Sequence, residues 1–225
     1  MSFYDIIIIN GEGSFHHNKT HKPAQGIYYC AEEFKKIGKK VFLINTVIHE
    51  ITYDLSIFDA IFTRESLSSQ GEHKVVNDAC FYNILDNSKN KENYVLFLDS
   101  VLPEVNKKIL KEYESYAGEK KYIKMDENKF DLDKFIKVCQ NASCIITGRY
   151  HGVVFSIMCE KKFIALESNT HKISGLLKDL DLLQNLTDDL SDLEKKIYLS
   201  KKPKVDIHKI KKDIEDMIDF CLMKL

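Results

Sequence analysis

Residues 144–152 read CIITGRYHG and are followed by the apolar run VVFSIM at 153–158. The apolar start predicts a strand, the glycine-edged centre a tight turn, and the second apolar run a helix, so this stretch is the strand–turn–helix unit of an α/β fold. Ligands of open α/β sheets bind beyond the carboxyl ends of the strands. Arg149 and His151 are therefore expected to project over that edge, beside exposed amides of a helix N-terminus.

This turn is a candidate anion site with a titratable partner. Arg149 would bind the anion, and His151 could donate a hydrogen bond to an oxyanion or carry a proton near neutral pH. The alternative is a histidine whose hydrogen bonds are satisfied by the backbone. Gly148 and Gly152 flank the two side chains and complete the predicted substrate-binding turn.

Arginine is rare in this chain. Of 33 basic residues only Arg64 and Arg149 are arginines, and Arg64 also follows an apolar run, in AIFTRES. A planar guanidinium binds a carboxylate or phosphate through two hydrogen bonds, whereas lysine offers a point charge. Their matching positions favour an anion site, with ordinary ion pairing as the alternative. At Arg64 the anion would also meet a helix N-terminus near residues 66–69.

Short β-rich runs alternate with helical patterns along the rest of the chain. Further strands are predicted at 4–10, 41–47, 60–64, 74–78, 94–99, 121–125 and 162–168, and further helices at 24–39, 103–117, 131–141 and 172–180. The uninterrupted run YDIIIIN at 4–10 is typical of a strand buried on both faces, so it is expected in the centre of a parallel sheet. Apolar residues recur every three or four positions from Ile207 to Cys221, which predicts a C-terminal amphipathic helix.

The polar segment NILDNSKNKEN at 83–93 lacks a periodic apolar stripe and is the best linker candidate. The β–α pattern starts again after it. The fold class is therefore α/β, with two Rossmann-like lobes at 1–88 and 89–203 around a cleft, followed by the helix at 204–225.

Composition narrows the classes of function. The chain has 225 residues, is 44% hydrophobic and carries a net charge of −1, which argues against a nucleic-acid-binding protein that relies on bulk charge. Its six cysteines form no CxxC pair and are predicted to be reduced thiols. No run approaches the roughly 18 apolar residues of a membrane span, and no signal peptide is apparent, so a cytoplasmic location is expected.

The turn GEGS at 11–14 follows the first predicted strand. Gly11 and Gly13 would let a ligand approach the backbone, and the Ser14 hydroxyl could hold a phosphate or carboxylate; a plain turn is the alternative. Phe15 and two histidines follow, and His16 is included in the predicted site. Adjacent histidines cannot easily face one metal ion from a strand, so no metal site is predicted. Asp78, after another strand, could belong to a site or cap the next turn.

Five segments, in this order, resemble the polysaccharide pyruvyl transferase family: NGEGSFHH at 10–17, TRESLS at 63–68, VVNDACF at 75–81, TGRYHGVVFSIMCEKKFIALES at 147–168 and THKISGLLKDLDL at 170–182. The resemblance implies a glycosyltransferase-B-like fold. It also implies transfer of the enolpyruvyl unit of phosphoenolpyruvate to a sugar hydroxyl in the biosynthesis of cell-surface polysaccharide such as capsule. The partners would be a carbohydrate acceptor and a phosphorylated small-molecule donor, with no separate cofactor, and a homo-oligomer is left open.

The resemblance assigns roles to individual residues. Arg149 and His151 match the family's Arg-x-His motif, which is implicated in holding phosphoenolpyruvate. Arg64 matches a second arginine, with Glu65 in place of the usual aspartate, and would bind the other anionic group. Lys172 matches a lysine near the sugar-facing edge of the second lobe.

The chain also departs from the family pattern. It starts at the strand that ordinarily follows an additional β–α unit, and Glu12 stands in the glycine turn where the family has glycine. Glu12 could instead be the general base of a glycosyltransferase that uses a sugar nucleotide. A non-catalytic subunit of glycan assembly is the third hypothesis.

Overall fold

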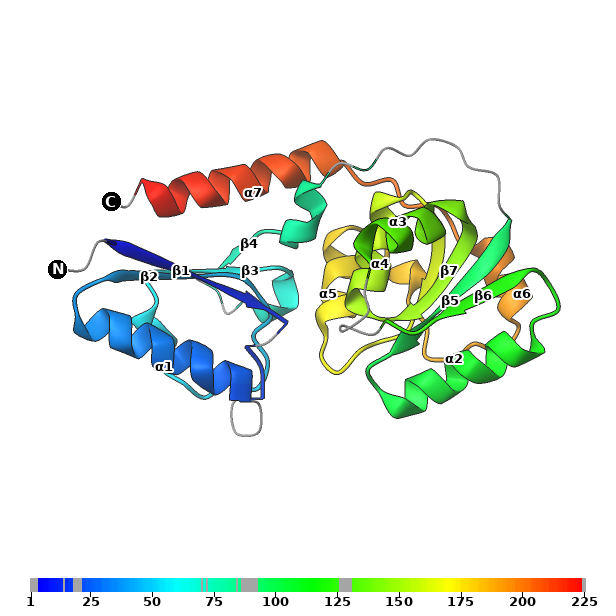
Figure 1. The fold of residues 1–225 in the computed structure, drawn as a ribbon, viewed down its shortest axis with the longest axis horizontal. Helices are drawn as coiled ribbons and strands as arrows, with labels where there is room; N and C mark the ends of the chain where they lie inside the picture. Colours follow the sequence, from blue (N-terminus) through cyan, green and yellow to red (C-terminus); the bar gives the residue numbers. More distant parts are fainter. Residues whose placement is uncertain are drawn as a thin grey trace. The chain divides into compact units, whose positions relative to one another are not determined.

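The computed structural model describes residues 4–13, 15–17, 22–69, 71, 73–83, 85, 93–125 and 131–223. The chain divides into two compact units, which are Met1–Tyr82 with His208–Leu225, and Asn83–Ile207 (Figure 1). The boundary falls at the start of the predicted linker. The C-terminal helix, which the sequence sets apart from both lobes, is part of the first unit.

The first unit contains a four-stranded parallel sheet in the order β1-β2-β3-β4. Its strands are β1 (Ile6–Glu12), β2 (Lys40–Thr46), β3 (Ala60–Thr63) and β4 (Lys74–Val75). The prediction that the first strand is central is wrong, because among the described residues β1 pairs only with β2 and lies at an edge. Ile8 in the middle of β1 is accordingly 40% exposed, although the strand reads as a buried one.

Two helices cover the two faces of this sheet (Figure 1): α1 (Lys22–Lys36) and α7 (Ile207–Leu222). Successive side chains of β2 point to opposite faces of the sheet. Val41 and Leu43 belong to the core cluster on the face that α1 covers. Phe42 points to the other face, where its ring centroid lies 6.5 Å from that of Phe220 of α7. The helical periodicity near the C-terminus therefore reflects burial against the N-terminal sheet.

The second unit contains another parallel sheet, in the order β6-β5-β7-β8. The strands are β5 (Tyr94–Ser100), β6 (Lys120–Ile123), β7 (Ala142–Gly148) and β8 (Lys162–Ala165). The helices are α2 (Pro103–Ser115), α3 (Leu132–Asn141), α4 (Tyr150–Met158), α5 (Lys172–Asp179) and α6 (Leu193–Leu199). All correspond to predicted elements except α6, whose seven residues are too few to show a helical period.

Helices also cover both faces of the second sheet. Ile109 of α2 and Leu193 of α6 pack in one core cluster with Phe97 of β5. On α3 and α4, the rings of Phe135 and Phe155 meet edge to face, 5.4 Å apart. The expected fold class, two Rossmann-like α/β units, is confirmed.

The strand order reverses in the second sheet but not in the first. In the second unit β6 lies on one side of β5 and β7 on the other, so the order switches between β5 and β7. Such a switch point leaves a crevice at the carboxyl ends of the two strands, because the helices that follow them lie on opposite faces. In the first unit the order runs one way from β1 to β4 and has no such switch. The topology therefore favours the turn after β7 as the binding site.

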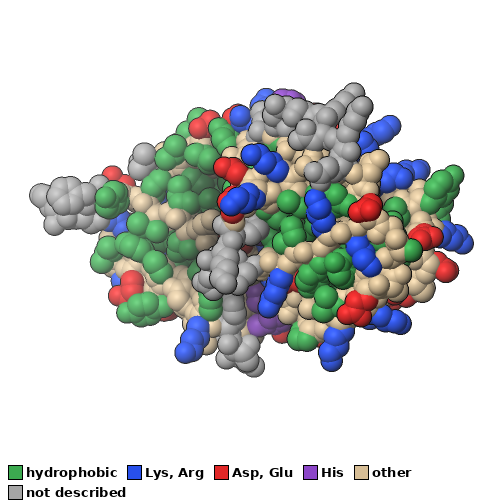
Figure 2. Space-filling view, turned by 45° about the vertical axis from the view of Figure 1, so that its right-hand side comes forward, with side chains coloured by type: hydrophobic (Ala, Val, Ile, Leu, Met, Phe, Trp, Pro, Cys, Tyr) green, Lys and Arg blue, Asp and Glu red, His purple; other side chains and the backbone are tan. Residues whose placement is uncertain are grey.

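The surface is mixed in charge. On the face shown in Figure 2, basic and acidic side chains alternate with apolar ones, as the net charge of −1 leads one to expect. None of the helices in the described part of the chain is long and apolar enough to cross a membrane. All six cysteines are free thiols, and burial raises the pKa of Cys144 to about 12, so this thiol is not a nucleophile at neutral pH.

Candidate functional site

Arg149 lies at the switch point and is held there by Asp99. Its Nε donates to Asp99 Oδ1 at 2.9 Å and its Nη2 to Asp99 Oδ2 at 2.6 Å, which is the bidentate arrangement of guanidinium and carboxylate. Nη2 also donates to the carbonyl of Met125 at 3.3 Å. Among the described residues Nη1 has no hydrogen-bond partner, so one edge of the guanidinium is fixed and the other can donate to a ligand.

A β-bulge places Asp99 beside the turn. Phe97 pairs with Ile146 and Ser100 with Gly148, so two residues of β5 stand opposite one residue of β7. A bulge of this kind re-aims a side chain at the rim of a sheet. Asp99 is 2% exposed, and sequence reasoning did not select it as a site residue, although it ends the apolar run YVLFLD just as Arg149 follows its own strand.

His151 is the second residue of α4, which begins directly after Arg149. Arg149 is the N-cap of this helix, and no side chain caps the helix amides. The N–H of Arg149 itself donates to Thr147 Oγ1 at 3.0 Å, which fixes the turn. The N-terminus of α4 therefore lies next to a guanidinium and an imidazole, and the positive end of its dipole favours an anion there.

At the N-terminus of α5, by contrast, a carboxylate of the protein already accepts hydrogen bonds from the helix amides. Glu167 accepts hydrogen bonds from the amides of Ile173 at 3.3 Å and Ser174 at 3.0 Å. Its carboxylate thus occupies the position that an anionic ligand would take. Lys172, predicted to face the sugar, begins α5 and donates to Asn169 Oδ1 at 2.9 Å. The Glu167 carboxylate therefore disfavours an anion at the N-terminus of α5, and α4 stays the predicted anion site.

Arg64 is buried in the first unit and paired with acids. It is 1% exposed, its Nη1 lies 2.8 Å from Asp78 Oδ2, and Asp78 is 0% exposed. Glu12 Oε2 lies 3.6 Å from the same nitrogen and accepts from the Gly13 amide at 2.9 Å. Asp78 also accepts from the Cys80 amide at 2.9 Å, so it caps the next turn as well. Two carboxylates already neutralise Arg64, which favours a structural role.

The helix expected to open after Arg64 is a 3₁₀ turn of three residues, Ser66–Ser68. Glu65 does not form a surface pair with Arg64. It is 0% exposed, and its carboxylate accepts from both the amide and the hydroxyl of Ser68. The prediction of a helix after Arg64 is therefore wrong, because the segment forms only this short turn and the Glu65 carboxylate accepts from its Ser68 amide. Anion binding by Arg64 stays a prediction.

Three of the predicted glycines, Gly11, Gly148 and Gly152, pack too closely against neighbours to carry a Cβ. A Cβ on Gly11 would lie 2.4 Å from Thr46 Oγ1, and one on Gly152 would lie 2.3 Å from Thr147 Oγ1. A Cβ on Gly148 would lie 2.6 Å from both Cβ and Oγ of Ser100 on the neighbouring strand. These contacts are closer than real carbon atoms approach, so each glycine makes room for the protein itself. Ser14 lies outside the described residues.

Replacing Gly148 by alanine is expected to destabilise the protein by about 1–3 kcal/mol, the usual cost of overpacking. The side chain it would meet is attached at Ser100 Cβ and cannot rotate away. Gly26 is the matched control, because it lies inside α1 with nothing within 4 Å of its added Cβ. Gly26→Ala should stabilise by roughly 0.5–1 kcal/mol. Urea unfolding of both variants measures the difference, and equal midpoints would contradict this packing.

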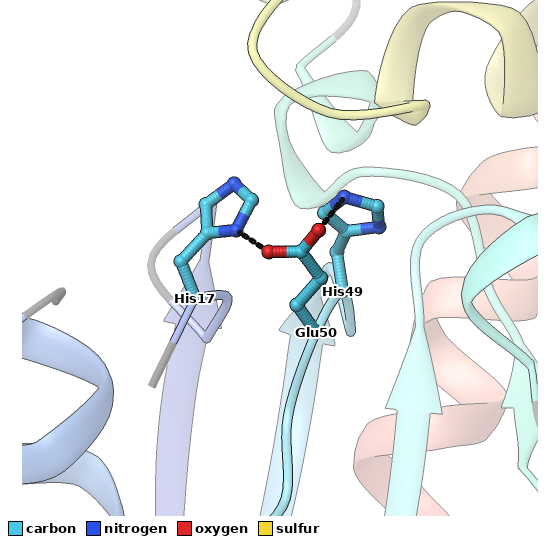
Figure 3. A group of neighbouring side chains, drawn as sticks. All are labelled: His17, His49 and Glu50. Carbon is cyan, nitrogen blue, oxygen red and sulfur yellow. Dashed lines mark hydrogen bonds and ion pairs between the residues drawn. The ribbon is translucent and has the colours of Figure 1, made fainter. Parts of the chain in front are cut away.

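The two adjacent histidines differ in burial and partners, although their ring centroids lie 4.8 Å apart. His16 is 5% exposed and forms an isolated parallel bridge with His49, whereas His17 reaches toward Glu50 (Figure 3). His17 Nδ1 lies 2.6 Å from Glu50 Oε2, and His49 Nε2 lies 3.8 Å from Glu50 Oε1. The hydrogen bond from His17 holds the pKa of the Glu50 carboxyl below its usual value. Sequence reasoning missed His49 and Glu50, which follow the second strand in the run VIHE.

A sequence model of the polysaccharide pyruvyl transferase family matches residues 2–170. The chain belongs to this family. The match spans the sheet of the first unit and runs through β8 of the second, so it includes both arginines and His151. Membership supports a transferase with a role in polysaccharide biosynthesis. No curated protein shows significant similarity to the chain.

Two solved structures share the fold of this family member. A functionally uncharacterised protein of Klebsiella pneumoniae has a TM-score of 0.53 and 13% identity, over 77% of this chain and 70% of its own. The UDP-GlcNAc 2-epimerase of Methanocaldococcus jannaschii, solved with UDP-GlcNAc and UDP, has a TM-score of 0.52 and 13% identity, over 95% of this chain and 75% of its own. At this identity the similarity concerns the fold alone.

Proposed function

We propose that this protein transfers the pyruvyl unit of phosphoenolpyruvate to a carbohydrate and forms a ketal, with Arg149 and His151 as the catalytic residues. The observation that carries the proposal is the geometry of Arg149 at the switch point. Asp99 fixes one edge of the guanidinium, and Nη1 remains as a donor beside the uncapped N-terminus of α4. A donor with two anionic groups suits this combination of guanidinium and helix amides.

The residues of the turn can supply the first proton of the reaction and stabilise its negative charges. A proton adds to the methylene carbon of phosphoenolpyruvate, the sugar hydroxyl adds to C2 and loses its proton, and the bond from C2 to the phosphate oxygen breaks. A neighbouring hydroxyl then closes the ketal and gives up the proton that leaves with phosphate. His151 would supply the first proton, while Arg149 and the N-terminus of α4 would stabilise charge on the carboxylate and the departing phosphate.

A glycosyltransferase that uses a sugar nucleotide is the second candidate. It is favoured by the fold shared with an epimerase that was solved with UDP-GlcNAc and UDP. The same α4 N-terminus would then receive a diphosphate. Glu12 remains the predicted base for this reaction, although Arg64 lies 3.6 Å from its carboxylate.

A binding experiment separates these functions. We expect phosphoenolpyruvate to raise the unfolding temperature and to give a calorimetric binding isotherm, since a ligand that binds only the folded state stabilises it. UDP- and CMP-linked sugars should have no effect at the same concentration. Binding of a sugar nucleotide alone would establish the second candidate. Binding of neither would favour a non-catalytic subunit of glycan assembly.

A further inference from the structure

Three potential metal ligands converge at the carboxyl edge of the first sheet (Figure 3). His17 Nδ1 or Nε2, His49 Nδ1 or Nε2, and a Glu50 carboxylate oxygen supply ligand atoms that all lie within 4.8 Å of one another. The carboxylate lies between the two imidazoles, 2.6 Å from His17 and 3.8 Å from His49. The ring centroids of the two histidines are 5.0 Å apart.

The fold, and not chance contact on the surface, brings these residues together. β1 and β2 are parallel neighbours, so the segments that follow them leave the sheet side by side. The bridge between His16 and His49 extends this pairing, and the amide of His17 donates to the carbonyl of His49 at 2.9 Å. His16 is 5% exposed and the side chain of His17 is 29% exposed, so His17 is the more accessible of the two adjacent imidazoles.

The backbone is strained at two of the three residues. His17 has φ of 47° and Glu50 has φ of 52°, in the left-handed region that non-glycine residues rarely adopt. Glu12 and Asn45, at the ends of the same two strands, also have positive φ, near 50°. Strain of this kind persists where the surrounding structure determines the conformation, and it concentrates at ligand sites.

We propose that His17, His49 and Glu50 bind a Zn²⁺ ion. Two imidazole nitrogens and one carboxylate oxygen are ligands that zinc takes at about 2.0–2.2 Å, which in a tetrahedral site places them about 3.4 Å apart. The separations of 2.6 Å from His17 Nδ1 to Glu50 Oε2 and of 3.8 Å from His49 Nε2 to Glu50 Oε1 lie on either side of this value. Side-chain rotations that bring one carboxylate oxygen toward both imidazoles would complete the ligand set. Imidazole ligands favour zinc over magnesium or calcium.

The exposure of the cluster suits an ion that enters from solvent. The side chains of His17 and His49 are 29% and 31% exposed, and that of Glu50 is 66% exposed. Three protein ligands leave the fourth position to water or to an oxygen of a bound molecule, as in zinc sites that act on substrates. The two imidazoles of this site do not come from the adjacent histidines. One is from His17 and the other from His49, in the segment after β2.

Zinc binding by the full-length chain tests the proposal directly. After chelator treatment and dialysis, calorimetry should detect one Zn²⁺ per chain, and Co²⁺ should give the absorption bands of a low-coordinate site. His17→Ala, His49→Ala and Glu50→Gln should each weaken binding on the order of tenfold or more, because each removes one of three ligands. His208→Ala and Glu33→Gln are matched controls at exposed positions outside the cluster and should bind as the wild type does.

Three results would overturn the proposal: no stoichiometric uptake by the wild type, uptake unchanged in the His17→Ala/His49→Ala double variant, or loss of binding only when cysteines are replaced. Circular dichroism of the metal-free variants identifies any that fail to fold, and Glu50→Gln retains the shape of the native side chain. Since the readout is metal binding in the absence of substrate, the outcome does not depend on the pyruvyl transferase reaction.

Discussion

Replacing Arg149 by lysine is expected to lower kcat/KM for pyruvyl transfer by roughly 10²- to 10³-fold, the usual cost of removing one preorganised donor from developing charge. Lysine retains a positive charge beside Asp99, so the fold should persist. It lacks the planar fork, however, and cannot hold Asp99 with two bonds while presenting the donors of Nη1 to a ligand. Phosphate release from phosphoenolpyruvate measures the effect.

The affinity for phosphoenolpyruvate gives a measurement that requires no acceptor. Arg149→Lys should raise Kd by roughly 10- to 100-fold, the equivalent of one charged hydrogen bond of about 1.5–3 kcal/mol. Lys178→Ala, at an exposed position late in α5, is the control and should leave Kd unchanged. An Arg149→Lys protein with the kcat/KM and Kd of the wild type would refute this site.

Asp99 should act as a positioning residue in the same reaction. Asp99→Asn retains Arg149 but weakens the bidentate pair that orients it. If orientation is its role, Asp99→Asn lowers kcat/KM in the wild type yet adds little in the Arg149→Lys background, because the two residues act as one unit. Additive losses would indicate that Asp99 has a separate function.

Replacing Asp78 by alanine is expected to destabilise the protein by about 3–5 kcal/mol, because it leaves a buried guanidinium without its nearest carboxylate. Arg64 and Asp78 are 1% and 0% exposed, and their charged atoms lie 2.8 Å apart. The amide of Cys80 would also lose its acceptor. Denaturant unfolding of the full chain gives the change in stability.

A double variant distinguishes the loss of the ion pair between Arg64 and Asp78 from the loss of side-chain packing. Arg64→Met together with Asp78→Ala removes both charges, so the double variant should be more stable than Asp78→Ala alone. Glu33→Ala, which breaks an exposed pair with Lys36, should leave the unfolding midpoint close to that of the wild type. If Asp78→Ala unfolds at the wild-type midpoint, the buried pair makes no contribution and Arg64 is available for another role.

The positions of most strands and helices could be predicted because their signals are local. Apolar runs such as YVLFLD and the three- and four-residue steps of the last helix reflect burial of one segment, whichever neighbour covers it. The place of a strand within its sheet is not local. β1 reads as a central strand because four consecutive isoleucines are apolar on both faces, yet it lies at the edge.

The sequence by itself determined the β–α alternation, the family, and the turn that carries Arg149 and His151, since each depends on residues adjacent in the chain. Only the tertiary structure decided their partners. Asp99 meets Arg149 from 50 residues away, and Glu50 meets His17 from 33 residues away. These pairs depend on strand order, bulges and register, which arise from packing over the whole sheet and leave no periodic signal in the segments that they join.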